Sequence, residues 1–207
     1  EDAMAFARRT GQDAIMRVGD AATHPEGGGP ILDWSDLERC REPDLAELRK
    51  GLQHDFDALD GTGIGLGLNL SGPFFTTYRS VGEVPIQDFM VMLYDNLPLV
   101  EAVMDRQVDY QLRKLQAVID LPIDFFSIAD DTCDARGFMC SPAMMATLWA
   151  PRMKKVVDLA KQKGVPVCWH CCGKLDQVIP YLLDWGIDCV NPVQTSCNDI
   201  FALHEDG

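Results

Sequence analysis

Basic residues are scarce in this sequence. It holds 18 Lys and Arg against 32 Asp and Glu, which gives a formal net charge of −14. A surface with this charge repels nucleic acid phosphates and anionic lipid, so we expect neither nucleic acid nor membrane as a partner. No apolar run approaches the ~20 residues that cross a bilayer. The first residues also lack the basic start and apolar centre of a secretory signal, so we expect a cytoplasmic protein.

A dinucleotide-binding loop is missing as well. Gly63, Gly65 and Gly67 alternate with aliphatic residues in a strand-like pattern, and no G-x-G-x-x-G opens a helix after a strand. These glycines instead suggest a strand with one crowded face, as barrel strands often have. Eight cysteines are present, and two of them, Cys171 and Cys172, are adjacent. Without a secretory signal, this pattern favours reduced thiols that serve metal binding or catalysis over a disulfide framework.

Strand-like and helix-like segments alternate along the chain. The strands expected from apolar runs and alternation are 14–18, 63–70, 124–129, 165–170 and 189–193. The helices expected from apolar periodicity and capping residues are 33–38, 44–59, 85–94, 96–119, 144–163, 175–185 and 199–204. Strands separated by helices imply βαβ units and a parallel sheet.

The length of the chain limits how much of a barrel it can form. A (β/α)₈ barrel takes ~250 residues, whereas this chain shows five strands in 207 residues. We therefore predict an α/β fold, a TIM-barrel-type parallel barrel that is C-terminally truncated, in one partial domain over residues 1–207. The open edge after the fifth strand exposes backbone groups. We expect a second copy to cover it in a homo-oligomer, or else poor solubility.

The strongest local signal for chemistry is the segment 169–174, where the fourth strand ends. In a (β/α)₈ barrel this end of the strands is the catalytic face. His170 and Cys172 are two residues apart and share a face of the strand, and imidazole and thiolate are typical zinc ligands. Cys171 is expected to point the other way. The alternative is a buried structural cysteine beside a hydrogen-bonded histidine.

Two further groups of polar residues fall at strand ends. Asp130 and Asp131 follow the third strand, where acids bind cations or transfer protons, or else cap a helix. Successive residues alternate in direction, so only one of the pair can point into the barrel, and Asp131 is our catalytic candidate. Asn69 on the second strand and Gln194 after the fifth can hold a polar ligand or cofactor, or else satisfy loop backbone groups.

Taken together, the motifs resemble the uroporphyrinogen decarboxylase superfamily. The segments that carry the resemblance are Asp130-Asp131, Gly137, Ser141-Pro142, Gly164-Val165-Pro166, His170-Cys171-Cys172-Gly173, Trp185-Gly186-Ile187-Asp188 and Asn191-Pro192-Val193-Gln194. Within the superfamily, the His-x-Cys-Gly phrase resembles the zinc-dependent, cobalamin-linked methyltransferase branch.

That resemblance implies a particular enzyme. Zinc would be held by His170, Cys172 and a further Cys expected beyond Gly207, with Asp131 as another ligand or as a group that orients the nucleophile. A methyl group would move between a corrinoid (cobalamin) on a carrier protein and a small thiol or related acceptor. Two alternatives stay open: a tetrapyrrole decarboxylase that needs no metal, and a non-catalytic member that binds a corrinoid or a partner. Arg17 and Arg79 are the basic candidates near the first two strands, few for a polycarboxylate substrate.

Overall fold

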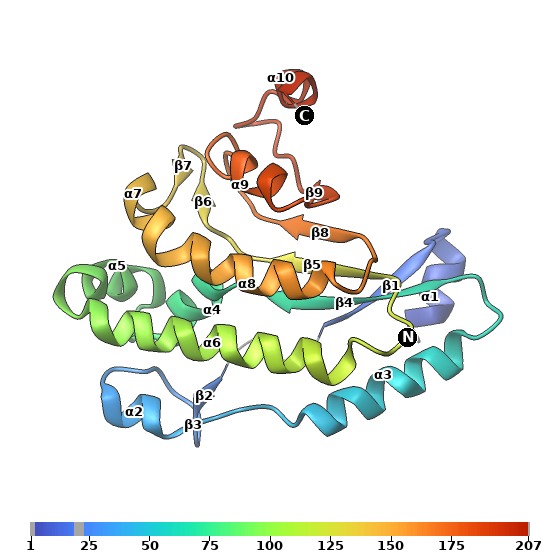
Figure 1. Cartoon of the computed structure of the whole chain (residues 1–207), viewed down its shortest axis with the longest axis horizontal. Helices are drawn as coiled ribbons and strands as arrows, with labels where there is room; N and C mark the ends of the chain where they lie inside the picture. The colour runs from blue at the N-terminus through green and yellow to red at the C-terminus, as the bar shows by residue number, and fades with distance from the viewer. Residues whose placement is uncertain (1–2, 19–22, 207) are drawn as a thin grey trace.

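The computed structural model describes residues 3–18 and 23–206 of the chain (Figure 1). Five strands form one sheet in the order β1-β4-β5-β8-β9, and every neighbouring pair is parallel. They are β1 (Ala14–Val18), β4 (Gly65–Ser71), β5 (Phe125–Ala129), β8 (Val167–His170) and β9 (Cys189–Asn191). The five predicted strands are all present, and the α/β fold of a TIM-type barrel sheet is confirmed. Two short antiparallel strand pairs accompany the sheet: β2 (His24–Pro25) with β3 (Cys40–Arg41), and β6 (Cys133–Asp134) with β7 (Gly137–Phe138).

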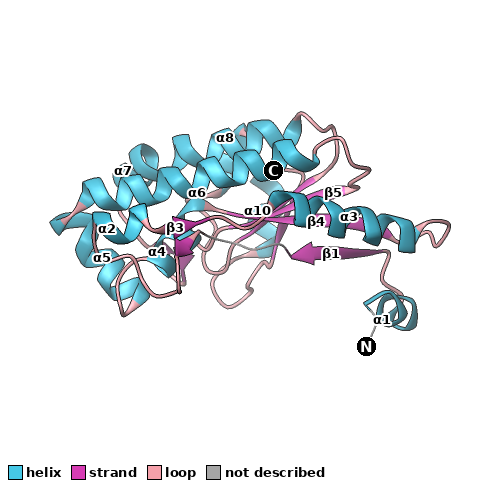
Figure 2. Cartoon of the chain, turned by 90° about the horizontal axis from the view of Figure 1, so that it is seen from below, coloured by secondary structure: helices cyan, strands magenta, loops and turns pink. Residues whose placement is uncertain are grey.

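Along the chain, most helices fall between successive strands of the sheet. They are α1 (Ala3–Thr10), α2 (Trp34–Glu38), α3 (Leu45–Leu59), α4 (Pro73–Ser80), α5 (Pro85–Asp95), α6 (Leu97–Val118), α7 (Pro142–Met144), the π-helical turn η1 (Met145–Trp149), α8 (Ala150–Lys161), α9 (Ile179–Asp184) and α10 (Ile200–Asp206). The long helices α3, α6 and α8 lie side by side along the sheet (Figures 1 and 2). Within the described ranges, no helix is both long and apolar enough to cross a membrane.

Four helical segments differ from the sequence-based expectation. The helix expected at 144–163 contains the π turn η1, which ends two residues before Pro151. This proline has no N–H to donate and crowds the preceding turn. The helix expected from Leu175 begins only at Ile179, because residues 175–178 form a turn. Helix α1 was not predicted, and neither was helix α4. Gly72 and Pro73 occupy its N-cap and first helical position, which is a favourable helix start.

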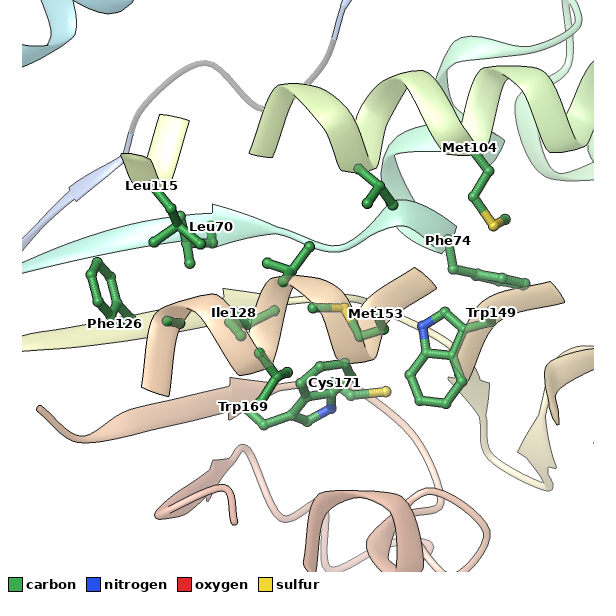
Figure 3. Close-up of a cluster of buried hydrophobic side chains, with 14 of the residues drawn as sticks. Leu70, Phe74, Met104, Leu115, Phe126, Ile128, Trp149, Met153, Trp169 and Cys171 are labelled. Atoms are coloured by element: carbon green, nitrogen blue, oxygen red, sulfur yellow. The ribbon is translucent and has the colours of Figure 1, made fainter. Parts of the chain in front are cut away.

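The two faces of the sheet have different characters. Leu66, Leu68 and Leu70 of β4 are buried toward the helices, where they join Phe126, Ile128 and Trp169 in the main core (Figure 3). On the opposite face, a Cβ atom at Gly67 would lie 2.2 Å from Cζ of Phe125. The ring of Phe125 therefore fills the space above this glycine, as the alternating pattern of β4 suggested.

The register of the sheet aligns the side chains of that opposite face in rows. One row runs through Asn69, Ser127, Cys168 and Cys189, which are successive partners across four strands. The next row, toward the carboxyl ends of the strands, runs through Ser71, Ala129, His170 and Asn191. The register thus brings His170 beside Asn191 and places both at the end of the sheet where a barrel carries its chemistry.

A cluster of aromatic rings surrounds Trp149 on the helix side of the sheet. The ring of Trp149 lies 6.0 Å from that of Trp169 and 5.3 Å from that of Trp185 (Figure 3 shows Trp149 and Trp169). Its indole N–H donates a hydrogen bond of 2.8 Å to Oδ2 of Asp130, which is fully buried. Trp149 therefore packs the core and also satisfies a buried acid that directly follows β5.

We expect Trp149→Phe to lower the free energy of unfolding by at least ~1.5 kcal/mol more than Trp185→Phe does, because only Trp149 donates to the buried carboxyl group. Both substitutions remove an indole from the same aromatic cluster, so the loss of ring volume is matched. Urea denaturation of the two variants measures the difference. Equal losses would show that the hydrogen bond to Asp130 contributes nothing.

Candidate metal centre

Three side chains of types that can bind metals meet at the carboxyl ends of β5 and β8. Asp131, His170 and Cys172 each offer one ligand atom, and these atoms lie within 4.8 Å of one another. The pairing of the strands explains why they meet. Ala129 and His170 are partners in the parallel ladder, and two residues further along each segment Asp131 lies beside Cys172. The structure therefore brings together the three residues that the sequence singled out for metal binding and catalysis. Whether they bind a metal stays a prediction.

The imidazole of His170 is oriented by a residue on the next strand. Its Nδ1 lies 2.7 Å from Oδ1 of Asn191, and its Nε2 lies 4.0 Å from Sγ of Cys172. When Nδ1 donates its proton to Asn191, the lone pair of Nε2 is left on the side of the thiol. Sequence reasoning missed this role of Asn191. The sequence signal that could have revealed it is the position of Asn191, because His170 and Asn191 each end a predicted strand and the two strands are neighbours in the sheet.

The turn after β8 presents Cys172. The backbone N–H of Cys172 donates to Oδ1 of Asp131 at 2.9 Å, and that of Lys174 donates to the carbonyl oxygen of Asp134 at 2.8 Å. Between them, Gly173 has a φ of +95° and donates its N–H to Oε1 of Gln194. The thiol is exposed at the mouth of the sheet. Burial raises the pKa of Cys172, and the charge of Asp131 raises it further, so the free thiol retains its proton at neutral pH.

The neighbouring acid and the neighbouring cysteine point away from this centre. Asp130 is fully buried and accepts the backbone N–H of Phe75 at 2.6 Å, at the start of α4. Burial raises the pKa of Asp130 to about 7, against the lowering effect of its hydrogen-bond donors. Cys171 is also buried, 3.6 Å from Oγ1 of Thr132. Of the two adjacent acids only Asp131 reaches the candidate centre, and of the two adjacent cysteines only Cys172 does. The alternation of side-chain directions requires this.

The two candidate cofactor-binding amides already make bonds within the protein. Nδ2 of Asn69 donates to the carbonyl oxygen of Ser127 at 3.3 Å, and Asn69 is buried. Gln194 supports the turn at Gly173. Neither lies in the three-residue cluster, and their binding of a cofactor stays a prediction.

The two basic candidates do not gather into a cationic pocket. Arg17 forms an ion pair with Asp55 of α3, and its guanidinium group lies against Gly51 of the same helix. Arg79 is exposed and lies over the ring of Phe75, 5.8 Å from its centroid. Arg17 therefore joins β1 to α3.

The donor set fits zinc. Carboxylate, imidazole and thiolate are its common protein ligands, and three such ligands leave a fourth position for water or substrate, as in catalytic zinc sites. The hydrogen bond between His170 and Asn191 is the kind of outer contact that fixes a ligating histidine. The further Cys that the family resemblance implies beyond Gly207 lies outside this sequence and stays an expectation.

Comparisons with known proteins agree with this architecture. The family model described as Uroporphyrinogen decarboxylase (URO-D) matches residues 5–199. A comparison with curated proteins gives no match. Among solved structures, a methyltransferase from Methanosarcina mazei is similar with a TM-score of 0.64 and 17% sequence identity; the alignment covers 91% of this chain and 60% of that chain. This chain therefore spans less than two thirds of that structure, and the likeness concerns the fold.

We expect Gly173→Ala to destabilise the chain by at least ~1 kcal/mol more than Gly186→Ala, because overpacking adds to the backbone strain. Both glycines have a positive φ, +95° and +68°, so both substitutions carry the ~1–2 kcal/mol cost of a left-handed residue. A Cβ atom at position 173 would also lie 2.4 Å from the carbonyl oxygen of Asp134, whereas at position 186 the nearest atom is 3.9 Å away. Urea denaturation gives the two values. Equal losses would mean that the turn bearing Cys172 is not tightly packed.

Proposed function

Because the chain belongs to the uroporphyrinogen decarboxylase (URO-D) family, we propose that it is a methyltransferase that moves a methyl group between a corrinoid (cobalamin) on a carrier protein and a small thiol. The observation that carries this proposal is the cluster of Asp131, His170 and Cys172, whose ligand atoms lie within 4.8 Å of one another. The similarity in fold to a methyltransferase from Methanosarcina mazei supports the same reaction class.

The donor set favours thiol chemistry over decarboxylation of a tetrapyrrole. A decarboxylase for a polycarboxylate substrate needs cationic groups at its mouth. Arg17 is paired with Asp55 on α3, and Asp131 brings negative charge to the mouth. Cys172 as a metal ligand contributes nothing to binding carboxylates. Methylation of a thiol, in contrast, needs a soft Lewis acid, and a centre with imidazole and thiolate ligands supplies one.

Zinc bound by His170, Cys172 and Asp131 would act as a Lewis acid that keeps an acceptor thiol deprotonated at neutral pH. The protein's own part is to hold these donors in place before a substrate arrives. Asn191 holds Nδ1 of His170 and so directs Nε2 toward the centre. Asp131 accepts the backbone N–H of Cys172 through Oδ1 and so lies beside the thiol that would share the metal with it.

The exposure of the centre suits a reaction that involves a second protein. Cys172 is exposed, and His170 and Asp131 are half-buried, so a methyl donor carried by a partner can approach from outside. The carboxyl ends of the strands, where these residues lie, are the face from which (β/α)₈ barrels take substrates. We therefore place the corrinoid carrier above the ends of β5 and β8.

We expect the chain to bind zinc with an affinity that falls more than ~100-fold in Cys172→Ser and in His170→Ala, because each removes a ligand rather than an outer contact. Asn191→Ala should weaken zinc by ~10–100-fold, since it removes only the group that orients His170. Competition with a chromophoric chelator measures these affinities. The matched control is Cys197→Ser, which changes a cysteine in the loop after β9. This variant should bind zinc like the wild type. Equal affinity in all variants would contradict the assignment.

We expect the chain, or a longer protein that contains it, to transfer the methyl group of methylcobalamin to one of a panel of small thiols. Chelation should abolish the transfer and added zinc should restore it, because the acceptor must be deprotonated. Appearance of the methylated thiol and of unmethylated cobalamin is measured together. Zinc binding without any transfer would favour a non-catalytic family member. Release of carbon dioxide from uroporphyrinogen that is insensitive to chelation would overturn the proposal.

A further inference from the structure

A second pair of sulfur atoms lies on the same face of the sheet, one row below His170. Cys168 of β8 and Cys189 of β9 are direct partners in the parallel ladder, and their Sγ atoms are 2.7 Å apart. Neither residue belongs to the cluster of Asp131, His170 and Cys172. Cys189 is exposed and Cys168 is half-buried, so the pair can be reached by a small solute in the described chain.

We propose that Cys168 and Cys189 form a redox-active dithiol that reduces small-molecule disulfides and closes reversibly into a disulfide across β8 and β9. Neighbouring strands hold paired residues ~4.8 Å apart. This spacing falls within the ~4.4–6.8 Å between Cα atoms that a disulfide requires. Because the ladder already sets this spacing and both side chains lie on one face, the backbone does not have to move for the bond to form.

The oxidation is a thiol–disulfide exchange with a disulfide of the glutathione type. The sulfur of Cys189, the more exposed of the two, attacks one sulfur of the small disulfide. The S–S bond of the small molecule breaks, and the first small thiol leaves with the proton of Cys189. Cys168 then attacks the sulfur of Cys189 in the mixed disulfide, and the second small thiol leaves with the proton of Cys168. The protein loses two electrons and two hydrogens, and the small disulfide gains them as two thiols.

Another close pair of cysteines provides an internal comparison. Cys133 and Cys171 both lie beside the hydroxyl group of Thr132, at 3.7 and 3.6 Å. Their exposed fractions are 3% and 0%, so a solute cannot reach them while the chain is folded. The proposal therefore predicts oxidation of one pair and protection of the other. It does not rest on the proposed methyl transfer.

The test treats the reduced chain, with a chelator present, with increasing oxidised glutathione, followed by alkylation of free thiols and mass spectrometry. We expect the wild type to lose two alkylatable thiols together and to become two hydrogens lighter, with fragmentation that links Cys168 to Cys189. Dithiothreitol should reverse the change. Cys168→Ser should stop at a mixed disulfide on Cys189 that carries one glutathione, because no second thiol remains to displace it.

Two further cysteines serve as controls, because each shares a tryptic peptide with Cys168 or with Cys189. Cys172 lies with Cys168 between Lys163 and Lys174, and Cys197 lies with Cys189 after Lys174. Cys172→Ser and Cys197→Ser should both retain the crosslink. Circular dichroism checks that every variant is folded, and the wild-type mapping stands without any variant. A mixed disulfide that persists on Cys189 in the wild type, a crosslink between other cysteines in place of this one, or no oxidation of the pair would each overturn the proposal.

Discussion

The parallel pairing of β5, β8 and β9 is the constraint on which the candidate chemistry depends. It sets Ala129 beside His170 and His170 beside Asn191. Side chains alternate along a strand, so a slip of one residue would turn His170 toward the helices and Trp169 toward the open face. The burial of Trp169 among the aromatic rings therefore fixes the direction of His170, and hydrophobic packing on one face of β8 positions the polar groups on the other.

The buried acid Asp130 extends this control to the loop after β5. It joins the start of α4 to Trp149 through the backbone N–H of Phe75 and the indole N–H. Both donors lie on the helix side, so Asp130 turns inward and the next residue, Asp131, turns toward the mouth. These hydrogen bonds offset part of the cost of burying the carboxyl group, although burial still raises its pKa to about 7. The position of Asp131 thus follows from the hydrogen bonds that hold its neighbour Asp130 in the core.

Sequence patterns reveal the parts of this molecule that depend on local periodicity. The five strands, the capped helix after Asp33 and the shared direction of His170 and Cys172 all follow from spacing. Helix α4 escaped prediction because its aromatic and β-branched residues have weak intrinsic helix propensity, and its start depends on hydrogen bonds to Asp130. The link from His170 to Asn191 depends on strands 21 residues apart in sequence, which periodicity does not reveal.

The measurement that tests the central claim most directly is X-ray absorption at the zinc edge on the zinc-loaded chain, compared with its Cys172→Ser variant. A centre of Asp131, His170 and Cys172 predicts one sulfur at ~2.3 Å and nitrogen or oxygen neighbours at ~2.0–2.2 Å. The sulfur neighbour should disappear in the variant while the fold is retained. A spectrum without sulfur, or a sulfur neighbour that persists in Cys172→Ser, would contradict the account.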